Sequence, residues 1–161
     1  MSMPLRRIGK SLACHRVMTV RRIVLAFVAG ALAVLVFHQP VLWLLHAAHV
    51  TPAVPYRLQP TRPFGVPQVW SLAFWGGLWG IVLAAVVSSV RHRWMAASLF
   101  GAVVPSLVAW FVVMPLKGQP AGAGWAGPMI VTALLVNAAW GFGTVLLLDL
   151  FSTPVHRRVA L

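Results

Sequence analysis

Acidic side chains are almost absent from this sequence. Asp149 is the only carboxylate among 161 residues, against 13 lysines and arginines. Reactions that need a pair of carboxylates, such as most glycoside hydrolysis, are therefore excluded. No phosphate-binding glycine loop and no Cys-His arrangement is visible either. We therefore expect a protein that is not an enzyme.

Cysteine and charge are scarce as well. Cys14 is the only cysteine, which excludes an intrachain disulfide. Charged residues make up 9% of the chain and hydrophobic residues 60%, whereas soluble domains carry about 25% charged residues. A water-facing surface cannot be built from so few charges. Apolar runs instead recur at about the 20 residues that cross a bilayer as a helix.

These runs predict an all-α membrane protein, a four-transmembrane-helix bundle. The expected domains are a basic, disordered cytoplasmic tail at 1–21, a transmembrane domain at 22–151 and a cytoplasmic tail at 152–161. Within the transmembrane domain the helices are expected at about 22–48, 70–90, 94–114 and 128–151. Pro40 removes a backbone donor and predicts a bend, so residues 41–50 either continue the first helix or lie along the membrane surface.

Lysine and arginine are distributed unevenly over the loops. With four spans, ten of them share one side: Arg6, Arg7, Lys10, Arg16, Arg21, Arg22, Arg91, Arg93, Arg157 and Arg158. The other side holds Arg57, Arg62 and Lys117. Because basic loops stay in the cytoplasm, we predict that both termini are cytoplasmic. The basic residues flank apolar runs, so the +12 charge indicates contact with the lipid bilayer and no nucleic-acid partner.

A few polar residues interrupt the apolar runs. His38, Gln39 and Asn137 form the candidate intramembrane polar site, because amides and imidazoles are costly in hydrocarbon unless bonded. His38 with His46 and His49 is a weak metal candidate, and His38 alone a weak haem candidate. No carboxylate or cysteine joins this group, so we expect no metal and no cofactor. The simpler interpretation is that these groups bond the backbone or a neighbouring helix.

Small residues at four-residue spacing mark three helix-packing faces. Such stripes let two backbones approach closely, either in a homo-oligomer or within one bundle. The three pairs are Gly76 with Gly80, Ala139 with Gly143, and Ala26 with Gly30. Pro63 to Trp75-Gly76 also has the spacing of Pro128 to Trp140-Gly141, which indicates either a duplicated hairpin or chance recurrence.

Asp149 falls in the last turn of the fourth predicted helix, where a negative charge opposes the helix dipole. A cationic partner is therefore expected. Arg91 and Arg93 lie on the same side of the membrane and are the candidates for an ion pair.

Two stretches resemble an uncharacterised family of small hypothetical four-helix inner-membrane proteins of proteobacteria. They are Phe37-His38-Gln39-Pro40 and the segment from Pro63-Phe64-Gly65-Val66-Pro67 into Leu72-Ala73-Phe74-Trp75-Gly76-Gly77-Leu78-Trp79-Gly80-Ile81. The resemblance covers roughly residues 18–150 and implies a bacterial inner-membrane location, but no activity.

The sequence thus predicts an integral inner-membrane protein that acts by helix packing. It would be a self-associating unit or an accessory subunit, with a homo-oligomer or another membrane protein as its partner. One alternative is a small transporter or channel lined by His38, Gln39 and Asn137. Another is a haem- or metal-binding membrane protein centred on His38.

Overall fold

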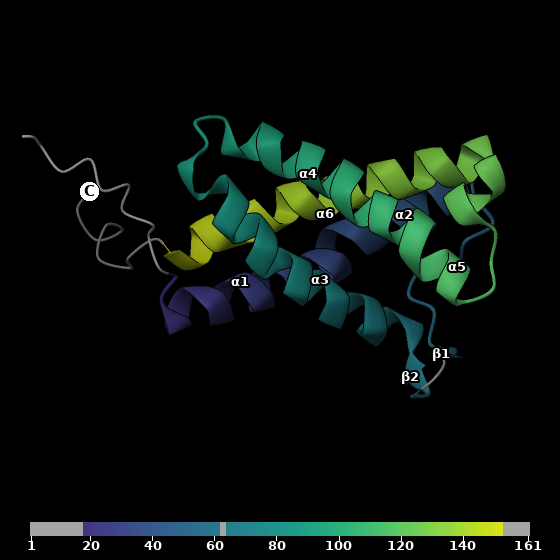
Figure 1. Cartoon of the computed structure of the whole chain (residues 1–161), viewed down its shortest axis with the longest axis horizontal. Coiled ribbons are helices and arrows are strands. Elements are labelled where there is room, and N and C mark those ends of the chain that lie inside the picture. The colour runs from purple at the N-terminus through teal and green to yellow at the C-terminus, as the bar shows by residue number, and fades with distance from the viewer. Residues whose placement is uncertain (1–17, 62–63, 153–161) are drawn as a thin grey trace, which may run out of the picture.

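Four long helices lie side by side in the computed structural model, which describes residues 18–61 and 64–152 (Figure 1). Each is long and apolar enough to cross a membrane, as expected of a multi-pass membrane protein. They cover Val20–Ala47, Gln68–Ser89, Arg93–Leu116 and Gly127–Ser152. These ends differ from the predicted ones by at most two residues. Residues 1–17 and 153–161, which hold most of the two expected tails, lie outside the described part, as do residues 62–63.

The spanning helices comprise several shorter elements. The first contains α1 (Val20–Ala33), a π-helical turn η1 (Val34–His38) and α2 (Gln39–Ala47). The second contains α3 (Gln68–Val86) and a 3₁₀ turn η2 (Val87–Ser89). The third contains α4 (Arg93–Val108), a π-helical turn η3 (Ala109–Val113) and α5 (Met114–Leu116), and the fourth is α6 (Gly127–Ser152). A short hairpin of β1 (Pro60–Thr61) and β2 (Val66–Pro67) precedes α3, and η4 (Ala121–Trp125) precedes α6.

Proline accounts for the irregular turns in the first and third helices. Pro40 follows η1 and Pro115 follows η3, each at the second residue of the next α-helix. A proline ring clashes with the carbonyl four residues before it and has no N–H to donate. A wider π turn changes the hydrogen-bond register immediately before that clash. The Gln39 N–H accordingly bonds the Val34 carbonyl, five residues back.

The first helix continues past Pro40, so residues 41–47 are helical and do not form a separate surface segment. It ends at Ala47, and His49, two residues later, has a positive φ of 57°. The N–H of Val50 bonds the Leu45 carbonyl at 2.9 Å, which closes the last turn. The third helix ends at Leu116, and Gly118, two residues later, also has a positive φ, of 70°. Both ends resemble the Schellman arrangement that satisfies the last carbonyls of a helix.

The helices pack in the order α3, α1, α6, α4, each against the next. The terminal end of the bundle holds Val20, residues 90–92 and Ser152, and the loop end holds residues 48–61, 64–67 and 117–126. Figure 1 shows the α3–α4 connection at the terminal end, near the start of α1 and the end of α6. α3 and α4 have few contacts with each other.

Two helix crossings, α1 with α3 and α4 with α6, have the same pattern of glycine contacts. At the first, a Cβ added to Gly80 would lie 2.9 Å from the Gly30 Cα and 2.6 Å from the Ala26 carbonyl oxygen. At the second, a Cβ on Gly141 would lie 3.3 Å from the Gly101 Cα and would overlap the Ala97 carbonyl. Backbones are therefore in direct contact at both crossings. In these contacts Gly80 corresponds to Gly141, whereas the sequence spacing from the prolines indicated Gly76, one turn earlier in α3.

Candidate functional site

The centre of the bundle is the indole of Trp140, which is 2% exposed. Its Nε1–H donates to the Gly30 carbonyl oxygen at 2.9 Å and so joins α6 to α1. A Cβ on Gly76 of α3 would lie 3.2 Å from the same nitrogen. Three helices therefore meet at this side chain. An N–H in the middle of an apolar helix needs a partner within the protein, so the sequence indicates that Trp140 is bonded but does not identify Gly30.

The predicted small-residue faces are occupied inside the bundle. Gly30, Gly76 and Gly80 contact one another across the α1–α3 crossing, and Ala26 is buried beside them. Gly143 lies against the ring of Phe37, whose Cε2 would be 2.9 Å from an added Cβ. Ala139 is half-buried. These stripes serve packing within one chain, which was the alternative to a homodimer face.

The three residues of the predicted polar site have separate surroundings. The Asn137 amide donates to the Ser106 hydroxyl at 2.9 Å, between α6 and α4. Gln39 is 1% exposed, and its Oε1 accepts the Tyr56 backbone N–H at 2.7 Å. The His38 Nδ1 is buried without a hydrogen-bond partner. Within the described residues no hydrogen bond joins any two of the three.

The histidines of the metal candidate also have separate surroundings. His46 Nδ1 lies 3.2 Å from the Thr51 carbonyl oxygen, to which it must donate because a carbonyl only accepts. His49 occupies the left-handed position after α2, which removes it from the helical i, i+3 relation to His46. Within residues 18–61 and 64–152, no group of three or more metal-ligating His, Cys, Asp or Glu side chains is present.

Tyr56 completes the kink of the first helix. Pro40 has no N–H to offer the Leu35 carbonyl, and the Tyr56 hydroxyl donates to that oxygen at 2.8 Å. The Tyr56 backbone N–H meanwhile binds Gln39. Two hydrogen bonds thus attach the loop to the first helix, one to the Leu35 carbonyl and one to the Gln39 side chain. An amide beside a proline in an apolar run indicates that such a partner is needed, but the sequence does not identify Tyr56 as that partner.

We expect Tyr56→Phe to lower the stability of the bundle by about 1 kcal/mol, the usual value of one intramolecular hydrogen bond. Phenylalanine keeps the ring and removes only the hydroxyl that reaches Leu35. Thermal unfolding in mild detergent measures the loss, with Tyr56→Ala as the variant that removes ring and hydroxyl together. If Tyr56→Phe unfolds at the wild-type temperature, the hydroxyl does not stabilise the kink.

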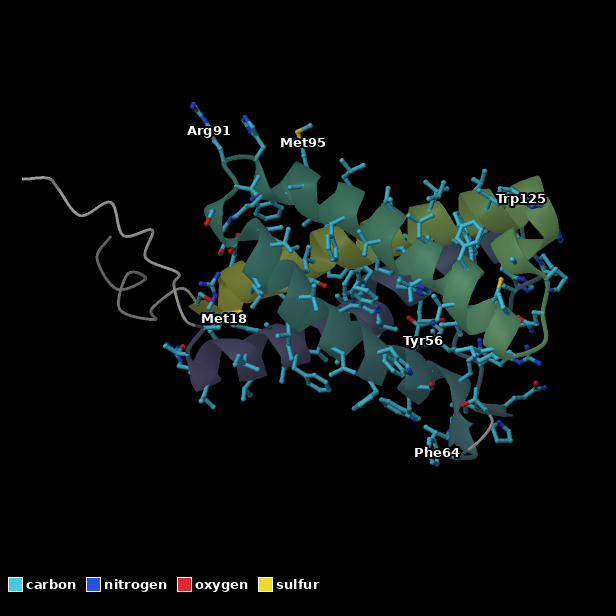
Figure 2. All side chains as sticks on the ribbon, in the orientation of Figure 1. Met18, Tyr56, Phe64, Arg91, Met95 and Trp125 are labelled. Atoms are coloured by element: carbon cyan, nitrogen blue, oxygen red, sulfur yellow. The ribbon has the colours of Figure 1, made fainter. Side chains whose placement is uncertain are left out.

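A second polar contact lies at the terminal end. The Arg93 Nη2 is 2.5 Å from the Asp149 Oδ1, with side chains 47% and 26% exposed. This ion pair links the start of α4 to the end of α6. Arg91, the other predicted partner, points away from the bundle (Figure 2). The sole acid of the chain thus has a structural contact at the helix ends.

Asp149→Asn should reduce the stability by up to about 1 kcal/mol, because a partly exposed ion pair contributes little more than that. High salt should reduce the difference between variant and wild type, since screening already weakens the exposed pair. Expression level and thermal unfolding at low and high salt measure both effects. An unchanged stability combined with a lost activity would instead assign Asp149 to function.

No family model, curated protein or solved structure matches this chain.

Proposed function

We propose that this chain is a non-enzymatic protein of a bacterial inner membrane that acts as an accessory subunit of a membrane complex. Its terminal end would face the cytoplasm, and its loop end would face the other side. The location is supported by the four spanning helices. The orientation is supported by the ten lysines and arginines on the terminal side against three on the loop side. The resemblance to proteobacterial inner-membrane proteins agrees with the location.

The observation that carries this proposal is the exposed surface of α4. Of the most apolar stretch of each spanning helix, 11% is buried in Arg93–Leu116, against 28–39% in the other three. Met95, Leu99, Val103 and Leu107 form an exposed stripe with four-residue spacing along α4. The glycine faces are already used inside the bundle. α4 is therefore the helix with the most surface left for a partner helix.

The interior polar groups support a packing role over transport. Asn137 is bonded to Ser106, and Gln39 is bonded to the loop through Tyr56. Both bonds hold elements of the bundle together. The partner of Asn137 lies on α4 and the partner of Gln39 lies in the loop before α3, so no direct hydrogen bond connects the two amides.

Affinity purification in mild detergent, with mass spectrometry and intact-complex mass, tests this proposal. We expect a stoichiometric foreign membrane protein. Leu99→Trp on the α4 stripe should release it, because a bulky side chain disrupts close helix packing. Val28→Trp is the matched control, on the exposed stripe of the first spanning helix (Val20, Val24, Val28, Leu32 and Val36). It should leave the complex intact.

A lone monomer in membranes of the native host would contradict the accessory role. A homo-oligomer that Leu99→Trp dissociates would indicate self-association through α4 instead of an accessory role. Equal loss of the partner with both tryptophan variants would show that α4 is not the contact surface.

A further inference from the structure

Hydrogen bonds join the described residues of the hairpin before α3. β1 and β2 pair antiparallel, with Pro60 opposite Pro67 and Thr61 opposite Val66. The Thr61 hydroxyl donates to the Val66 carbonyl at 2.8 Å, and the Gly65 N–H bonds the Thr61 carbonyl at 2.8 Å. Gly65 has a φ of 67°, a conformation that glycine adopts without strain. Phe64 precedes this glycine and is 86% exposed.

The hairpin and α3 are joined by hydrogen bonds. The first N–H groups of a helix have no partner within the helix. Here the Gln68 N–H bonds the Gln59 carbonyl at 3.0 Å, and the Val69 N–H bonds the Arg57 carbonyl at 3.1 Å. The chain before the hairpin thus caps α3. The position of Phe64 is therefore fixed relative to the axis of α3.

The hairpin leaves the bundle sideways. Figure 1 shows β1 and β2 beside the loop end of α3, away from the other helices. In Figure 2, Phe64 points outward from the bundle, and Trp125 lies farther toward the loop end than Phe64 does. Because the helices run along the long axis, a membrane surface would be perpendicular to it. A side chain that projects sideways at this level would meet the lipid headgroups.

Exposed apolar side chains extend from the hairpin onto α3. Leu58, Phe64, Val66 and Trp70, here called the Phe64 patch, are 67%, 86%, 40% and 55% exposed. Phe74, one turn after Trp70, is 53% exposed on the face of α3 that would contact lipid. Aromatic side chains concentrate at the membrane–water interface. Arg57, whose guanidinium donates to Gln59 at 2.7 Å, precedes Leu58 in the chain.

We infer that the Phe64 patch is a lateral lipid anchor, with Phe64 inserted at the boundary between headgroups and acyl chains. The occupant is the leaflet on the loop side, because the patch continues the lipid-facing surface of α3. Arg57 would lie at the level of anionic headgroups. This inference rests on the proposed membrane location and is independent of the accessory role. The anchor would fix the tilt of α3 through its hydrogen bonds to residues 57–59.

Site-directed spin labelling tests the anchor in the full chain. Cys14 is the only cysteine, so Cys14→Ser gives a background for single labels at Val66→Cys, Gln119→Cys and Leu107→Cys. The protein is reconstituted in phosphatidylethanolamine and phosphatidylglycerol vesicles. Collision rates with oxygen and with a water-soluble nickel complex are then measured. Gln119 is exposed in the other connection at the loop end, and Leu107 lies on the exposed stripe of α4.

We expect the oxygen-to-nickel ratio at Val66 to be several-fold higher than at Gln119 and lower than at Leu107. Adding Phe64→Ser should lower the Val66 ratio to the Gln119 value. A Val66 ratio equal to that of Gln119 with Phe64 present would overturn the anchor alone. Exclusion of both reagents at Val66 would also overturn it, in favour of a protein contact. A water-like ratio at Leu107 would overturn the membrane location and the anchor with it.

Discussion

Gly141→Ala is expected to separate α6 from α4 and to destabilise the bundle by about 1–3 kcal/mol, the cost of overpacking a close contact. The added methyl group would overlap the carbonyl of Ala97, with 2.9 Å to the carbonyl carbon. These are backbone atoms of a helix and cannot move without the helix. The better helix propensity of alanine, about 1 kcal/mol, is too small to offset the clash. Unfolding in mixed micelles of mild detergent and SDS measures the change.

Gly127→Ala is the matched control, because it makes the same chemical change in the same helix. No heavy atom lies within 4 Å of a Cβ at Gly127, and the residue has no positive φ. This variant should unfold like the wild type or slightly later. Equal destabilisation by both substitutions would mean that the cost comes from α6 itself. A neutral Gly141→Ala would mean that the two backbones do not touch.

Trp140→Ala should have the second large effect, a loss of about 3–5 kcal/mol, as for other large buried aromatic side chains. It empties the space where α1, α3 and α6 meet and removes the bond to the Gly30 carbonyl. Trp140→Phe retains most of the ring and should cost only about 1–2 kcal/mol, the range for an interhelical hydrogen bond in a membrane. The same micelle titration compares the two variants.

Trp125→Ala provides the exposed control for Trp140. Trp125 is 72% exposed at the loop end, so its removal should change the stability little. If Trp140→Phe is as damaging as Trp140→Ala, the N–H contributes more than the packing of the ring. If neither variant differs from Trp125→Ala, the junction at Trp140 does not hold the bundle together.

The number and extent of the helices could be predicted from sequence, because hydrocarbon thickness sets a minimum length for each apolar run. The small-residue stripes could also be found from their spacing. Their partners could not, since Gly80 and Gly76 have the same residue type and differ by only one turn. The structure assigns Gly80 to the position that corresponds to Gly141. The register between helices depends on the combined fit of both surfaces, which a pattern in one helix does not contain.

The candidate site was less predictable. His38, Gln39 and Asn137 stand out because they are polar among apolar residues, yet polarity does not specify a partner. Asn137 binds Ser106, and Gln39 binds a backbone N–H that lies 17 residues later in a loop. A loop that folds back onto a helix leaves no periodic signal. The sequence therefore does not identify Ser106 as the partner of Asn137 or Tyr56 as the partner of Gln39.

The repeated crossings have a consequence for reassembly from fragments. Each half contains a complete helix pair, Gly30 with Gly80 in one and Gly101 with Gly141 in the other. The halves meet mainly where α1 lies against α6, at the bond between Trp140 and Gly30. A chain divided between Arg91 and His92 should therefore yield two hairpins that associate when they are produced together. Trp140→Ala should abolish this complementation while leaving each hairpin able to insert.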